Sequence, residues 1–146
     1  CNAIDNNKLY ILKADVLTEW EKLIQAKEVI TTGPLLFKEL QKEPLLNSSF
    51  YTSRHPRTVV GVKKNGLVLL ITIDGRSQES AGMTIAELQK IMLWFGCIDA
   101  INLDGGGSTT MYIKNMSENG VVNHPSDNKK FDNYGERKVA NSIIVF

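Results

Sequence analysis

Apolar residues recur along this chain in two kinds of pattern, one typical of helices and one typical of strands. Residues 15–28 show the helical pattern, because Leu17, Trp20 and Leu23 follow one another at three-residue spacing. Side chains at such spacing lie on one face of an α-helix. An amphipathic helix is therefore expected near the start of the chain.

A second helix, with its own start and stop signals, is predicted over residues 84–95. Thr84 and Glu87 have the spacing of a capping box, in which each side chain accepts a hydrogen bond from the other residue's backbone N–H. Gly96 is expected to end the helix, because glycine readily adopts the left-handed conformation found at helix C-termini. The residues expected on its apolar face are Leu88, Ile91, Met92 and Phe95.

The strongest β signal is a hairpin. Residues 57–63 are rich in valine and threonine, residues 67–74 form a second apolar run, and Asn65-Gly66 separates them. An Asn-Gly pair between two such runs favours a tight two-residue turn. Two adjacent antiparallel strands are therefore expected here.

Shorter apolar runs predict further strands. They are expected at 28–32, 98–103, 110–114, 121–122 and 139–146, with a strand or short turn at 35–40. Loops are expected at 45–57 and 123–137, where no period is evident. Strands outnumber helices, which favours an α+β fold: a single domain with a largely antiparallel mixed sheet covered by one main helix, 84–95.

A chain of 146 residues suits one compact domain. We divide it into a helical lead-in, residues 1–29, and the domain proper, residues 30–146. The exposed edge strands of such a domain favour pairing with another chain or with a missing N-terminal half. A monodisperse monomer in sedimentation would contradict that prediction.

Composition narrows the function classes. The net charge is +1, so the chain has no global electrostatic attraction for nucleic acid. The longest apolar run, at 67–73, has the length of a strand and is too short to span a bilayer. The two histidines, His55 and His124, lack the spacing of metal ligands, so no zinc site is expected.

Two cysteines do not make a disulfide framework. Cys97 lies in an apolar stretch and is expected to be a buried thiol, although pairing with Cys1 remains open. Cys1 itself has two interpretations: a lipid-anchored cysteine left after removal of a signal peptide, or an arbitrary boundary. The first interpretation places the chain in the cell envelope or outside the cell.

Three consecutive glycines, residues 105–107, are the main candidate for chemistry. Successive glycine N–H groups form a concave nest that binds anions, and Asp104 adds a carboxylate beside it. A glycine-rich hairpin with a capping aspartate is the structural alternative. The loop is not a phosphate-binding P-loop, because no Gly-Lys-Ser/Thr sequence follows.

Other charged residues also fall where β runs begin or end. Asp74 and Arg76 follow one run, and Arg57 opens another. If these ends meet on one side of the sheet, they form a pocket with two carboxylates, arginines and the glycine loop. Carboxylates stabilise cationic sugar transition states, and guanidinium groups hold phosphate. The combination suggests a substrate that is both sugar and phosphate.

These residues resemble those of the phosphodiester glycosidase family, in order from about residue 30 to the C-terminus. The segments that carry the resemblance are RHPRTVVGV, LLITIDGRSQESAGMTIAELQKIMLWFGCIDAINLDGGGSTTMYI, VVNHPSDN and ERKVANSIIVF. The resemblance implies hydrolysis of an α-linked sugar-1-phosphodiester, such as an N-acetylglucosamine-1-phosphodiester, to the sugar and a phosphomonoester. It implies no obligatory cofactor.

The resemblance also assigns residues to the site. The catalytic candidates are Asp74, Asp104, Arg57 and Arg76. The candidates for binding substrate or phosphate are Thr58, Gly75, Gly105, Gly106, Gly107, Ser108, Thr109, Arg137 and Asn141. In this hypothesis the arginines and glycine amides neutralise the leaving phosphate, and Asp104 or Asp74 acts as nucleophile or base at the sugar carbon. Ser108 is a weaker nucleophile candidate, because no histidine is recognisable as its base.

Two alternatives remain open. Members of the family are usually longer and carry a preceding half with an Asn-Gly-x-Phe-like motif, which is not found before residue 30. The chain would then be a non-catalytic carbohydrate- or phosphate-binding fragment of a longer envelope protein. In the second alternative the glycines only form turns and the protein is structural.

Overall fold

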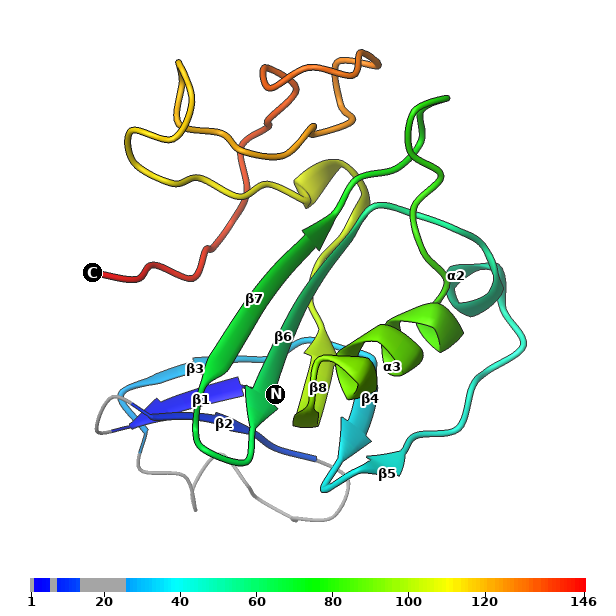
Figure 1. Cartoon of the computed structure of the whole chain (residues 1–146), viewed down its shortest axis with the longest axis vertical. Helices are drawn as coiled ribbons and strands as arrows, with labels where there is room; N and C mark the ends of the chain where they lie inside the picture. Colours follow the sequence, from blue (N-terminus) through cyan, green and yellow to red (C-terminus); the bar gives the residue numbers. More distant parts are fainter. Residues whose placement is uncertain (1, 6–7, 14–25) are drawn as a thin grey trace.

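The structure is a computed structural model that describes residues 2–5, 8–13 and 26–146. Most of the helix predicted over residues 15–28 lies outside the described residues, and Glu28 already belongs to a strand. The elements follow one another as β1 (Asn2–Asp5), β2 (Lys8–Ile11), β3 (Glu28–Ile30), β4 (Leu35–Lys38), β5 (Gln41–Lys42), α2 (Ser49–Thr52), β6 (Arg57–Lys63), β7 (Val68–Ile73), α3 (Ile85–Trp94), β8 (Cys97–Asn102) and the 3₁₀ turn η1 (Gly106–Ser108) (Figure 1).

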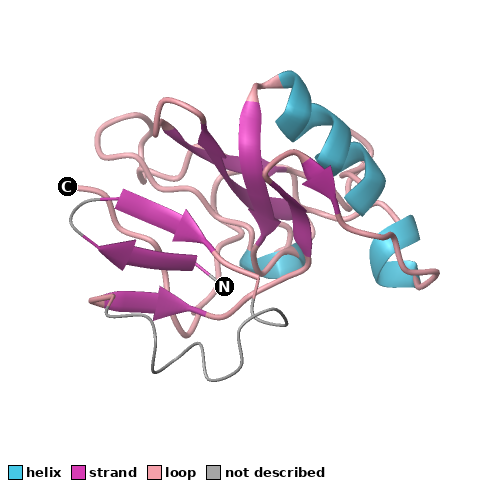
Figure 2. Cartoon of the chain, turned by 90° about the horizontal axis from the view of Figure 1, so that it is seen from below, coloured by secondary structure: helices cyan, strands magenta, loops and turns pink. Residues whose placement is uncertain are grey.

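The strands form two antiparallel sheets. Five of them pair in the order β5-β4-β8-β6-β7, and three pair in the order β2-β1-β3. Figure 2 shows α3 on one face of the five-stranded sheet and the smaller sheet on the opposite side. The predicted α+β class and the covering helix are confirmed. The second sheet was not predicted: β1 and β2 lie in the segment assigned to a helical lead-in, whereas β3 confirms part of the strand predicted at 28–32.

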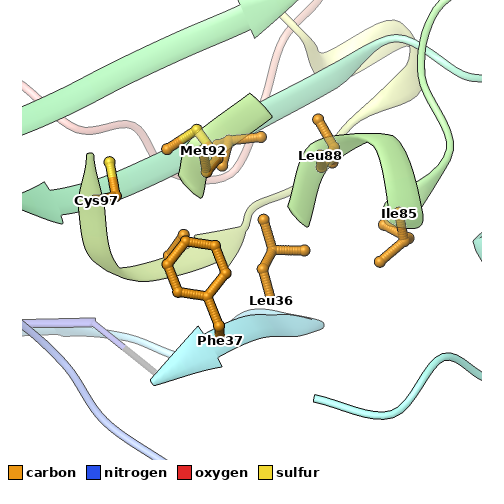
Figure 3. Packing of buried hydrophobic residues seen from close by; sticks show 8 residues of the cluster. Leu36, Phe37, Ile85, Leu88, Met92 and Cys97 are labelled. Carbon is orange, nitrogen blue, oxygen red and sulfur yellow. The ribbon is translucent and has the colours of Figure 1, made fainter. Parts of the chain in front are cut away.

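Strand alternation produces two cores, one on each face of the larger sheet. In β6, Val59 faces α3 and belongs to the main cluster, whereas Val60 faces away and packs with Ile11 of β2 and Ile101 of β8. Successive side chains of a strand point to opposite faces, so one run of valines serves both layers. The main cluster, drawn in Figure 3, consists of Leu36, Phe37, Val59, Ile85, Leu88, Met92, Cys97 and Ala100.

Helix α3 begins and ends as its sequence predicts. The hydroxyl of Thr84 accepts the Glu87 backbone N–H, and the Glu87 carboxylate accepts the Thr84 backbone N–H at 2.9 Å. Gly96 follows the helix with a φ of +78°. Of the predicted apolar face, Leu88 and Met92 are fully buried, and Ile91 and Phe95 pack partly buried against the same cluster.

The predicted hairpin is present, with a different turn. The pairs run from Arg57↔Ile73 to Val62↔Val68. Gly66 donates its N–H to the Lys63 carbonyl and has a φ of +84°, while Asn65 keeps a negative φ. A two-residue type I′ turn would need positive φ at both positions. The connection is instead a longer turn that ends in a left-handed glycine.

Three predicted strands and one predicted loop need correction. Residues 110–114 and 121–122 form only one isolated bridge, Tyr112↔Val121, and residues 139–146 form no strand. In that last segment Ile143 packs partly buried, but Val145 and Phe146 are exposed. β-branched sequence becomes a strand only where a neighbouring strand offers a surface to pack on. The predicted loop at 45–57 contains the single-turn helix α2.

The remaining sequence predictions have mixed outcomes. Cys97 is buried and free, and burial raises the pKa of its thiol. Cys1 lies outside the described residues. No helix in the described part of the chain has the length and hydropathy needed to cross a membrane. Strands β5 and β7 form the edges of the larger sheet, and pairing of an edge with a partner remains a prediction.

Candidate active site

Strand register brings the predicted site residues to one end of the larger sheet. Arg57, at the start of β6, pairs with Ile73 at the end of β7, and Val59 pairs with Asn102 at the end of β8. Asp74 and Asp104 therefore leave the sheet at the same end as the start of β6. The C-terminal loops, coloured orange in Figure 1, lie over this end.

The glycine run forms a 3₁₀ turn and not the predicted nest of free amides. Pro56 accepts the Gly106 N–H at 2.9 Å, and carbonyls within the turn accept the N–H groups of Ser108 and Thr109. The Asp104 carboxylate accepts the N–H of Gly105 at 2.9 Å. Among the amides of 105–109, only that of Gly107 has no bonded acceptor in the described part of the chain. The turn therefore offers an anion one backbone donor, not three.

The glycines instead allow three neighbours to approach closely. A Cβ at Gly105 would lie 2.8 Å from the Pro56 carbonyl oxygen, and one at Gly106 would lie 2.9 Å from Nη2 of Arg76. A Cβ at Gly107 would overlap the carboxylate of Asp127. Glycine is needed here because the backbone packs directly against charged side chains.

Two exposed arginines flank this turn. The guanidinium of Arg76 lies against Gly106, and Nη2 of Arg137 donates to the Ser108 hydroxyl at 2.7 Å. Arg137 also lies 3.5 Å from the Asp127 carboxylate. Burial, and then the charges of Arg57 and Arg76, lower the pKa of His55.

Arg57 does not join the other arginine candidates. Its side chain is buried under α2 and α3, where Nε donates to the Met83 carbonyl at 2.9 Å. Nη2 donates to the carbonyls of Phe50 at 2.7 Å and Ser53 at 3.2 Å. Burial lowers the pKa of Arg57 from its ordinary value. The structure thus places this residue in the packing beneath the site.

The other binding candidates lie in three different settings. Thr58 points to the opposite face from Arg57, and its hydroxyl lies 3.3 Å from that of Thr109, beside the turn. Gly75 is buried, and a Cβ there would lie 2.9 Å from the Pro56 nitrogen, so its place is in packing. Asn141 is exposed, and no described residue bonds to its side chain.

The two candidate carboxylates differ in their surroundings. Asp104 is exposed at the turn, where one oxygen accepts the Gly105 N–H. Asp74 is held on both oxygens: Oδ1 accepts from the backbone N–H of His124 at 2.9 Å and from Nδ2 of Asn123 at 3.0 Å, and Oδ2 lies 2.9 Å from Nδ1 of His124. Asp104 is therefore the carboxylate with more freedom to meet a ligand.

Sequence reasoning missed Asn123 and His124. In the sequence His124 is an isolated loop histidine, because 50 residues separate it from Asp74 and no local spacing connects them. Asn123 also donates to the Thr109 carbonyl at 3.0 Å, which ties this segment to the glycine turn. The one signal in the sequence is the segment VVNHPSDN, which carries part of the family resemblance.

Gly82 supports the entrance of β6, and an alanine there is expected to lower the free energy of unfolding by about 2–4 kcal/mol. Gly82 has a φ of +84°, and a Cβ would overlap the His55 backbone. Gly66 is the matched control: it has the same φ but open space around it, so alanine should cost about 1–2 kcal/mol. Urea unfolding of both variants measures the difference. Equal losses would contradict the predicted overlap.

No cluster of three or more potential metal ligands occurs among the residues that the structure describes. Among the titratable groups at the site, Asp74 pairs with His124.

Comparison with known proteins identifies the class. Residues 2–146 match the phosphodiester glycosidase family, and the chain belongs to this family. The predicted resemblance is therefore confirmed, and it extends into the first 29 residues.

Individual relatives match over shorter segments. The SPbeta prophage-derived protein YomE of Bacillus subtilis is 41% identical over 70 residues, which are 44% of this chain and 11% of YomE. The N-acetylglucosamine-1-phosphodiester α-N-acetylglucosaminidase of Bos taurus is 35% identical over 71 residues, which are 49% of this chain and 12% of that enzyme. The chain thus spans a small part of the length of these relatives.

A solved structure shares the fold. The catalytic domain of the zebrafish N-acetylglucosamine-1-phosphodiester α-N-acetylglucosaminidase, in a form auto-inhibited by its pro-peptide, is similar with a TM-score of 0.51 and 25% sequence identity. The similarity covers 63% of this chain and 33% of the zebrafish chain.

Proposed function

We propose that this chain carries the site of a glycosidase that hydrolyses an α-linked sugar-1-phosphodiester to the free sugar and a phosphomonoester. The observation that carries the proposal is the glycine turn, where Asp104 lies together with the exposed Arg76 and the Ser108-bound Arg137. Family membership supports the reaction class. The name of the bovine relative supports N-acetylglucosamine as the sugar.

The charges of the turn fit the two ends of the scissile bond. A phosphodiester is an anion, and guanidinium groups bind phosphate oxygens through paired N–H donors. Arg76 and Arg137 can provide these donors beside the turn. Asp104 supplies negative charge for the cationic character that develops at the sugar carbon. The leaving phosphate gains a second negative charge as the bond breaks, and the arginines stabilise it.

Hydrolysis in ¹⁸O-labelled water tests the proposal. The substrate is methyl N-acetyl-α-glucosaminyl phosphate, and mass spectrometry follows both products. We expect the label in the released N-acetylglucosamine and none in methyl phosphate, because the C1–O bond breaks. Label in the phosphate would show attack at phosphorus and contradict a glycosidase.

A non-catalytic binding fragment is the second candidate, favoured by the small share of the relatives that the chain covers. A folded protein that binds N-acetylglucosamine-1-phosphate in calorimetry, but releases no sugar, would support this second candidate.

The proposal also includes a location of the protein in the cell envelope or outside the cell. Fractionation of cells that produce the native protein tests the location.

A further inference from the structure

We infer that His124 is the proton-transferring group of this site and that Asp74 is its positioning residue, not the nucleophile. This inference rests on the proposed function, which it deepens by assigning the step that activates water. Neither role was assigned from the sequence, where Asp74 is a candidate nucleophile and His124 has no role.

Asp74 is fully engaged. Its Oδ2 lies 2.9 Å from Nδ1 of His124, and its Oδ1 accepts two N–H groups, from the His124 backbone at 2.9 Å and from Asn123 at 3.0 Å. An ionised carboxylate can only accept hydrogen bonds, so Nδ1 carries a proton in this pair. A carboxylate that already accepts three hydrogen bonds is a poor nucleophile toward carbon, because attack would require breaking them.

The imidazole ring is also held on one face. Phe131 stacks on His124 with ring centroids 3.9 Å apart and an angle of 11° between the planes. The side chain of Asn133 fixes the backbone there, since its Nδ2 donates to the Asn123 carbonyl at 2.8 Å. The carboxylate and the stacked ring together define the rotation of the imidazole. Such positioning is what general catalysis by histidine needs.

Nε2 remains available. With the proton on Nδ1, a neutral imidazole has its lone pair on Nε2. No described residue bonds to Nε2, and the His124 side chain is 31% exposed. An exposed, oriented lone pair suits a general base that meets a water molecule.

The pair is tied to the glycine turn through one residue. Nδ2 of Asn123 donates both to Asp74 and to the Thr109 carbonyl at 3.0 Å, and its Oδ1 accepts the Met111 N–H at 2.8 Å. Thr109 follows Ser108, to which Arg137 is bonded. The base and the proposed phosphate contacts therefore belong to one bonded network.

The step balances as follows. A water oxygen forms a bond to the sugar C1, or to the C1 of a glycosyl-enzyme, while its proton passes to Nε2. The bond from C1 to the leaving oxygen breaks, and that oxygen keeps the electron pair. The imidazolium then returns the proton to solvent. The Asp74 carboxylate stabilises the imidazolium through Nδ1.

Kinetics of His124→Ala on the same phosphodiester provide the first test. We expect kcat to fall on the order of 10²-fold with little change in KM, and the decline of kcat at acidic pH to disappear. Added imidazole should restore part of kcat, which a purely structural role would not allow. His55→Ala is the matched control at the same end of the sheet, and it should keep the acidic decline. An unchanged kcat in His124→Ala would overturn the inference.

Nitrogen-15 NMR of labelled histidine provides a test that does not depend on turnover. In the wild type we expect the neutral ring to carry its proton on Nδ1, and Asp74→Asn to shift the proton toward Nε2. A wild type that binds sugar phosphate without hydrolysing it would refute the proposed function alone, because the NMR result still decides the Asp74–His124 pair. A proton on Nε2 in the wild type would overturn the inference even in an active enzyme.

Discussion

Replacing Arg57 with methionine is expected to lower the free energy of unfolding by about 3 kcal/mol or more, because a buried side chain loses its hydrogen bonds to three backbone carbonyls. Arg57 is 1% exposed and donates to the carbonyls of Met83, Phe50 and Ser53. A domain of this size has only about 5–15 kcal/mol of stability, so the loss is a large fraction of the total. Urea unfolding measures it.

Cation–π packing strengthens this expectation. The Arg57 guanidinium lies 4.7 Å from the centre of the Phe50 ring, so it joins α2 to the start of β6 through a ring contact and a hydrogen bond to the same residue. Methionine keeps the aliphatic volume and removes only the donors and the charge. Lysine should not restore stability, because its single ammonium cannot reproduce the planar fork of donors.

Arg76→Met is the matched control for Arg57→Met. Arg76 is exposed beside the glycine turn, so its loss should change the free energy of unfolding by less than about 0.5 kcal/mol. In ligand binding the order should reverse, so that Arg76→Met weakens binding of the ligand more than Arg57→Met does. If Arg57→Met unfolds like the wild type but Arg76→Met is destabilised, the assignment of the two arginines to packing and site is reversed.

The contrast between these arginines explains part of what the sequence could predict. Alternating valines, the capping box and the Asn-Gly turn located β6, β7 and α3 correctly, because each is a local property of adjacent residues. Antiparallel pairing then brings the ends of β6, β7 and β8 together. The location of the candidate site followed from these elements. The sequence did not show which of Arg57 and Thr58 lies on the face covered by α3, since alternation fixes only that the two side chains face opposite sides.

Contacts between distant segments account for what remained hidden. His124 and Asp74 meet because the loop after Val122 folds back over the end of β7, a path that no residue spacing encodes. The Gly106 amide is occupied because the carbonyl of Pro56, which lies just before β6, accepts its N–H. Residues 139–146 have strand-like composition, yet their conformation depends on whether a neighbouring edge is present. In each case the missing information is tertiary.

Replacing Asp104 with asparagine is expected to lower kcat for phosphodiester hydrolysis on the order of 10³-fold and to leave the fold intact. Asparagine keeps an oxygen that can accept the Gly105 N–H, as the Asp104 carboxylate does at 2.9 Å, so the turn keeps its cap. Only the negative charge is lost. Release of N-acetylglucosamine from the methyl phosphodiester measures kcat, and urea unfolding checks the fold.

Glu118→Gln is the control for Asp104→Asn, because it also removes one exposed carboxylate, here one that accepts a hydrogen bond from Tyr134. It should hydrolyse the substrate at the wild-type rate. If Asp104→Asn keeps more than about a tenth of the wild-type kcat, the effect is below that of a group in contact with the reacting carbon, and the carboxylate only caps the turn.

The anomer released first by the wild type then separates the two possible roles of Asp104. Proton NMR that detects the α-anomer first indicates retention, in which Asp104 attacks the sugar carbon and His124 activates water in a second step. The β-anomer first indicates direct attack by water, so that Asp104 stabilises charge without forming a bond. Asp104→Asn should reduce kcat in both cases. Only retention predicts a glycosyl-enzyme intermediate that mass spectrometry can trap. If a retaining enzyme forms no such intermediate, Asp104 is excluded as the nucleophile.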